Sequence, residues 1–131
     1  MLRTFPYLAL AVAAYNAAVL GTQSRLDEAI GGVPLPSGVT WSFDMGDLIV
    51  IAALLLLFIE ILAATSIRRS SIVNHGLSTL VFVVCVVEFL LVPGCGTTAF
   101  LLITLMALLD LVAGFSISIL TARRDWSVER L

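Results

Sequence analysis

The segment from Leu48 to Ile67 is almost entirely aliphatic and holds one charged residue, Glu60. A helix of about 20 apolar residues spans the hydrocarbon core of a bilayer, and a charged group inside such a span is costly. Only 12% of the chain is charged and 60% is hydrophobic, against about 25% charged in an average soluble domain. The chain therefore belongs to the helical membrane proteins, and Glu60 needs an explanation.

Hydropathy divides the chain into apolar segments separated by polar residues or helix breakers. Pro6 fits the first turn of a helix, and Pro93 with Gly94 ends another, so that PGCGT forms a tight hairpin turn. The first segment also resembles a secretory signal peptide, but we expect it to be a retained helix. The sequence predicts an all-α membrane protein, a four-transmembrane-helix bundle in a single integral membrane domain over residues 1–131, with spans at about 5–20, 46–67, 74–92 and 97–120.

Residues 21–45 form the one sizeable polar segment. The glycines and prolines of GGVPLPSGVTW exclude a continuing helix, so we expect a loop. Its LDEAI piece is expected to form one amphipathic turn on the bilayer surface. Trp41 and Phe43 stand where interfacial aromatic residues anchor the helix that follows.

The arginines predict the orientation. With four spans, Arg25 lies on one side of the membrane, and the other side holds Arg3, Arg68, Arg69, Arg123, Arg124 and Arg130. Basic residues gather on the cytoplasmic side of membrane proteins. We therefore expect both termini to be cytoplasmic and the 21–45 loop to face outward.

Three acids lie inside the expected spans: Glu60, Glu88 and Asp110. From each span's midpoint, Asp110 lies near mid-membrane, Glu60 about 4 to 5 Å toward the cytoplasm and Glu88 about 7 to 8 Å outward, at 1.5 Å per residue. Acids at that depth must face protein or water rather than lipid.

Small and polar residues indicate how these acids are sheltered. Ala64 follows Glu60 by one helical turn, and Ala107 and Gly114 flank Asp110, as expected where helices approach closely. In the first span, Ala9, Ala13 and Ala17 recur at intervals of four and form a small-residue ridge that we expect to serve helix packing. A partial polar seam between the third and fourth spans is predicted to contain Asn74, Ser78, Thr79, Cys85 and Thr104, with Asp110 level with Ser78 and Thr79 and Glu88 near Thr104.

Three roles remain open for the acids. Each can be a neutral acid that donates a hydrogen bond across the bundle, part of a proton or cation site, or a docking group for a basic residue of another protein. His75 is expected to be an interfacial polar group, with a proton relay as the alternative. We expect Asn16 to bond a neighbouring helix, Cys85 to act as a small hydrophobe and Cys95 to be able to link two copies.

Signatures of catalysis are missing from the sequence. It contains no nucleophile elbow, histidine-rich metal set, glycine-rich phosphate loop or C-x-x-C pair, so we expect neither an enzyme nor a metal or other cofactor. It has no basic stripe for nucleic acid. We expect a non-enzymatic accessory or assembly subunit that docks on other membrane helices, within a homo-oligomer or a larger membrane complex. The alternative is a proton or cation pathway, or an ion-coupled transporter, formed by a homo-oligomer around the buried acids.

Three segments, PSGVTWSFDMGD, SIVNHGLSTLVFVVCVVEFLLVPG and LLDLVAGFSISI, resemble those of a widespread family of small bacterial inner-membrane proteins with four predicted spans. The resemblance covers nearly the whole chain. It implies four spans and a multi-pass location in the bacterial cytoplasmic membrane, and it assigns no catalytic or binding residue. Small multidrug-resistance transporters share the size, but the first span here lacks their essential glutamate.

Overall fold

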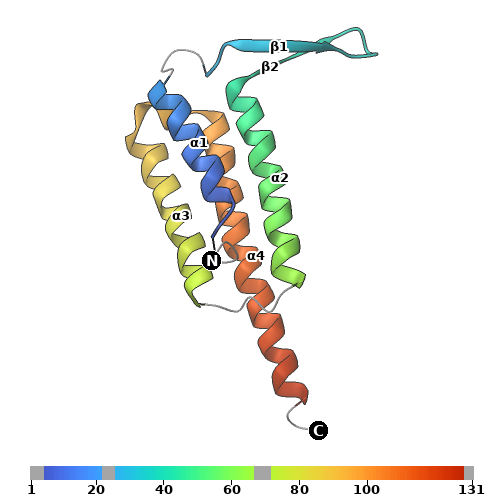
Figure 1. Ribbon diagram of the computed structural model, residues 1–131, viewed down its shortest axis with the longest axis vertical. Coiled ribbons are helices and arrows are strands. Elements are labelled where there is room, and N and C mark those ends of the chain that lie inside the picture. Colours follow the sequence, from blue (N-terminus) through green and yellow to red (C-terminus); the bar gives the residue numbers. More distant parts are fainter. Residues whose placement is uncertain (1–4, 22–25, 67–71, 129–131) are drawn as a thin grey trace.

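A computed structural model describes residues 5–21, 26–66 and 72–128. These residues form four helices that run beside one another, with a β-hairpin at one end of the bundle (Figure 1). We call this end the hairpin end, and the end toward which α4 extends the tail end. The elements are α1 (Leu8–Gly21), β1 (Ala29–Pro34), β2 (Thr40–Asp44), α2 (Met45–Ser66), α3 (Ile72–Leu91), a 3-10 turn (Pro93–Cys95) and α4 (Thr98–Val128).

Three of the four described helices, α2, α3 and α4, are long and apolar enough to cross a membrane. The first helix differs, because α1 has 14 residues. At 1.5 Å per residue α1 is about 21 Å long, which is less than the roughly 30 Å of a hydrocarbon core. The helix therefore gives no support to a full first span over residues 5–20. It runs beside the half of the bundle nearer the hairpin (Figure 1).

The segment expected to be a loop forms an antiparallel β-hairpin instead, so the described chain is mostly helical rather than entirely helical. Val33 pairs with Trp41 and Gly31 with Phe43, while residues 26–28 are not helical. Gly38 has a φ of 84°, a left-handed conformation that glycine adopts without strain, and its N–H donates to the Leu35 carbonyl in the connecting turn. The β-branched and aromatic residues flanking this turn are typical of strands.

Side-chain caps fix where α2 and α4 begin. The backbone N–H of Asp47 donates to the Asp44 carboxylate at 2.8 Å, and the N–H of Asp44 donates back to Asp47 at 3.2 Å. This reciprocal pair is a capping box, with an aspartate in place of the usual glutamate. Thr97 caps α4 by accepting a 3.2 Å hydrogen bond from the N–H of Phe100.

The core lies where α4 packs against α2 and α3, with α1 closing the bundle against α2. The Tyr15 ring meets the Phe100 ring at 5.0 Å, and its hydroxyl is hydrogen-bonded to the Thr97 hydroxyl. The side of α1 that faces the core consists of Leu8, Ala11, Val12, Tyr15 and Val19.

The fourth helix continues to Val128, beyond the expected end at Leu120, and projects past the other helices (Figure 1). Arg123 and Arg124 lie on this extension and are exposed. The other arginines used for the orientation (Arg3, Arg25, Arg68, Arg69 and Arg130) lie outside the described residues. The cytoplasmic location of both termini therefore stays a prediction.

Candidate functional site

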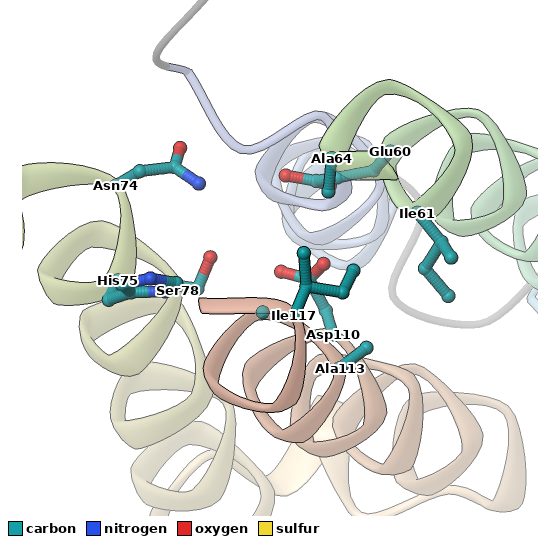
Figure 2. A pocket seen from close by; sticks show the side chains of 10 residues that line it. Glu60, Ile61, Ala64, Asn74, His75, Ser78, Asp110, Ala113 and Ile117 are labelled. Atoms are coloured by element: carbon teal, nitrogen blue, oxygen red, sulfur yellow. The ribbon is translucent and has the colours of Figure 1, made fainter. Parts of the chain in front are cut away.

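A small cavity lies among α2, α3 and α4, and two of the three intramembrane acids, Glu60 and Asp110, line it. Its volume is about 20 Å³. A polar cavity needs roughly 10–15 Å³ of such volume to hold one water molecule. Figure 2 shows side chains from the three helices directed toward it. Its polar lining consists of Glu60, Asn74, His75, Ser78 and Asp110, and the rest is Ile61, Ala64, Ala113, Gly114 and Ile117.

Glu60 reaches the cavity from α2, and its side chain is only 5% exposed. The backbone N–H of Leu8 donates to Glu60 Oε2 at 3.3 Å. Leu8 is the first residue of α1, so this N–H has no acceptor within its own helix, and the helix dipole favours a carboxylate there. The first turn of α1 thus lies level with Glu60, and its N-terminal N–H group is bound by this acid.

Asp110 reaches the same cavity from α4 and is 8% exposed. The Ser78 side chain on α3 lies within hydrogen-bonding reach of its carboxyl group, and His75 interacts with it electrostatically. The sequence predicted that the tight turn after Pro93 aligns α3 and α4 antiparallel, with Asp110 level with Ser78, and this is confirmed. Both acids are sheltered inside the chain, as the cost of a lipid-facing charge requires.

His75 is held by three residues of α4. Its Nε2 lies 2.6 Å from the Ser118 hydroxyl, and its ring stacks on Phe115 with centroids 5.0 Å apart. A Cβ at Gly114 would lie 3.2 Å from His75 Nδ1, so glycine makes this close approach possible. The sequence placed His75 near the helix end as an interfacial group, whereas the structure makes it part of the cavity wall.

Glu88 lies apart from the other two acids, near the hairpin end. The Asn16 side-chain amide on α1 donates to Glu88 Oε2 at 2.9 Å, and the Cys95 thiol donates to Asn16 Oδ1 at 3.7 Å. The prediction that Asn16 bonds a neighbouring helix is confirmed. The partner of Glu88 is thus Asn16 on α1, rather than Thr104 on α4.

The predicted polar seam is interrupted. Thr79 and Thr104 are hydrogen-bonded to carbonyls of their own helices, at His75 and Phe100 respectively. Cys85 is fully buried. Among the predicted seam residues, Asn74 and Ser78 reach the cavity and the other three do not.

Small residues serve two different surfaces. Ala64 and Gly114 line the cavity, and Ala107 is buried in the core. The ridge on α1 does not pack inside the chain, since Ala13 and Ala17 are exposed and Ala9 is half-buried. The reason is that the larger residues on the other side of α1 fill the space against α2 and α4.

A second and wider cavity, of about 190 Å³, lies toward the tail end. It is lined by Thr65, Ile117, Leu120, Thr121 and Arg124. Ile117 lines both cavities, so the inner cavity of the acid pair and this outer space border the same side chain. In the opposite direction the core is closed by fully buried side chains, among them Ala53, Cys85 and Ile103.

Neither protein-family models, nor curated proteins, nor solved structures give a match to this chain. Within the described ranges, no three His, Cys, Asp or Glu side chains are grouped as metal ligands. The site must therefore be interpreted from its own chemistry. Around space for one water, the two carboxyls and the imidazole are groups that can bind and release a proton, and the hydroxyl and the amide donate and accept hydrogen bonds.

Proposed function

We propose that this chain is a multi-pass membrane protein that binds and releases a proton at Glu60 and Asp110, as the protonation site of proton-coupled transport. The observation that carries the proposal is the single small cavity shared by both carboxyls and His75. Two ionised carboxylates on one desolvated cavity repel each other, so the pair retains a proton that a water molecule can exchange. His75 provides a second group that accepts and returns a proton.

The arrangement of the two cavities supports proton access from the tail end. The wider cavity gives water a place two helical turns from Asp110, and Ile117 borders both spaces. Toward the hairpin end, buried side chains close the core. This conformation is therefore one access state, in which the pair exchanges protons with one side only, and transport requires a second conformation.

We place the tail end in the cytoplasm. Arg123 and Arg124 lie there, and the distribution of the arginines in the sequence agrees. The resemblance to small bacterial inner-membrane proteins supports the cytoplasmic membrane of a bacterium as the location. Large exposed aliphatic side chains on α2, α3 and α4 suit contact with lipid or with a second copy of the chain.

Infrared difference spectroscopy on the reconstituted protein tests the proposal. We expect a protonated-carboxyl C=O band that changes with pH and is lost in Asp110→Asn and altered in Glu60→Gln. Asp27→Asn, which changes an exposed acid, should leave the band unchanged. The proposal would be overturned if the carboxyl band titrated identically in wild type and Asp110→Asn. Size-exclusion chromatography would first establish that both proteins are folded.

Changes at Ile117 test the access route separately. Ile117→Ala should speed exchange of the carboxyl proton after a pH jump, and Ile117→Trp should slow it, with the equilibrium titration unchanged in both variants. Leu109→Ala, which shortens an exposed side chain of the same helix, is the matched control. Equal exchange rates in all of these proteins would contradict entry past Ile117.

An accessory or assembly subunit is the second candidate, and the outward ridge of α1 favours it. Glu60 and Asp110 are enclosed by this chain's own helices, so the exposed Ala13 and Ala17 would carry the docking. Ala13→Leu with Ala17→Leu should then dissociate the native assembly in mild detergent. Under the proton-site proposal the same variant keeps its carboxyl titration, so the two measurements separate the candidates.

A further inference from the structure

The β-hairpin has one apolar side. The register places Val33 opposite Trp41, and the pairing continues outward to Leu35 and Val39, where the N–H of Leu35 donates to the Val39 carbonyl at 2.9 Å. Since side chains alternate along a strand, these four share one side of the sheet with Phe43. The opposite side carries Gly32, Pro34, Thr40 and Ser42.

This apolar side is open to the surroundings. The exposed fractions are 45% for Val33, 42% for Leu35, 63% for Val39 and 45% for Trp41. The Trp41 and Phe43 rings lie together, with centroids 5.4 Å apart. A two-stranded hairpin by itself is marginally stable in water, so a stable one needs a surface to cover such a side.

The position and charge of the hairpin identify that surface. Its strands run across the direction of the helices at the hairpin end (Figure 1). β2 passes directly into α2, which is long enough to span and whose exposed side chains include Leu48 and Ile51. The hairpin is thus joined, with no intervening loop, to a helix whose exposed aliphatic side chains suit contact with lipid. Residues 29–43 contain no charged side chain, and Asp27, Glu28 and Asp44 bracket them.

We propose that the hairpin lies flat on the bilayer, with its apolar side among the lipid headgroups and upper acyl chains. An amphipathic element with aromatic residues on its apolar side binds at this depth, where Trp is enriched. The lack of charge lets the strands approach the interface without desolvating an ion. The hairpin then sets the depth of α2 in the membrane, and this inference does not depend on the proton site.

The two tryptophans of the chain allow a direct test in liposomes. Trp126→Phe leaves Trp41 as the only tryptophan, which can be excited at wavelengths that the two tyrosines do not absorb. We expect lipids brominated near the headgroup to quench its fluorescence several-fold more than they quench a reporter on the other side of the same strand. That matched control is the triple variant Trp41→Phe, Ser42→Trp, Trp126→Phe, which should be quenched mainly by aqueous iodide.

Each outcome decides the proposal. Quenching of Trp41 by brominated lipid and protection from iodide supports it. Quenching of Trp41 by iodide without quenching by lipid overturns it, as does equal quenching at positions 41 and 42. Protection from both quenchers also overturns it, because a second copy or another protein then covers the apolar side. Size-exclusion profiles matching wild type confirm that both variants are folded.

Discussion

The side-chain amide of Asn16 donates a 2.9 Å hydrogen bond to the Glu88 carboxylate and so ties α1 to α3 near the hairpin end. The Asn16 carbonyl oxygen is used as well, since it accepts from the Cys95 thiol. This cluster therefore links α1, α3 and the 3-10 turn. We interpret this cluster as a structural junction, whereas the cavity around Asp110 is the place where we propose proton exchange.

Removing the junction should destabilise the bundle. Asn16→Ala removes the amide that donates to the Glu88 carboxyl, and hydrogen bonds between membrane helices contribute about 0.6 to 1.7 kcal/mol. A double-mutant cycle with Glu88→Ala, measured by unfolding in detergent, should give a coupling free energy in that range. Ala17→Ser, one residue away and exposed, is the control. Additive effects of the two substitutions would show that the bond contributes nothing to stability.

The capping box at the start of α2 should be measurable in the same assay. Asp44→Ala removes the acceptor for the N–H of Asp47, and loss of such a cap costs about 0.5 to 2 kcal/mol. Asp44→Ser keeps a side-chain oxygen at the cap and should retain most of the free energy of unfolding. The cap has no structural importance if the Ala and Ser variants unfold at the same denaturant concentration.

Gly94 should tolerate no side chain. A Cβ there would lie 2.4 Å from Val19 Cγ1, and the branched Val19 side chain has little rotamer freedom in a helix. Overpacking of this kind costs about 1 to 3 kcal/mol, so Gly94→Ala should lower the melting temperature. Val19→Ala in the same chain should restore part of the loss. The matched control is Gly96→Ala in the same turn, where the nearest atom is 3.6 Å away.

The Cys95 thiol should react at higher pH than an ordinary cysteine. Its side chain is buried, and burial raises the pKa of this thiol, with the nearby Glu88 raising it further. A raised pKa means less reactive thiolate at a given pH, so in a Cys85→Ala background the alkylation rate should rise with a midpoint above the usual value of about 8.5.

Two further measurements complete the test at Cys95. Glu88→Gln removes the negative charge and should move the alkylation midpoint to lower pH. The expectation that Cys95 links two copies is not supported by its burial, so non-reducing gels of the intact protein should show no disulfide-linked dimer. An alkylation midpoint at or below the ordinary value would contradict the buried, acid-flanked thiol.

Hydropathy and helix breakers by themselves determined α2, α3 and α4 and the turn at Pro93. These features depend on each residue's own free energy of transfer into lipid and on local backbone chemistry, which a sequence carries directly. The same reasoning required Glu60 and Asp110 to be sheltered, and both are. The antiparallel register across the short turn was enough to place Asp110 beside Ser78.

Only the tertiary structure decided where the other groups lie. It starts α1 beside Glu60 and turns the ridge of Ala13 and Ala17 outward. It also pairs Glu88 with Asn16 and brings His75 onto the cavity wall. The physical reason is that the rotation of a helix about its axis depends on how side chains far apart in sequence fit together. Local hydropathy is nearly the same on every side of α1 and α2, so it cannot select their rotation.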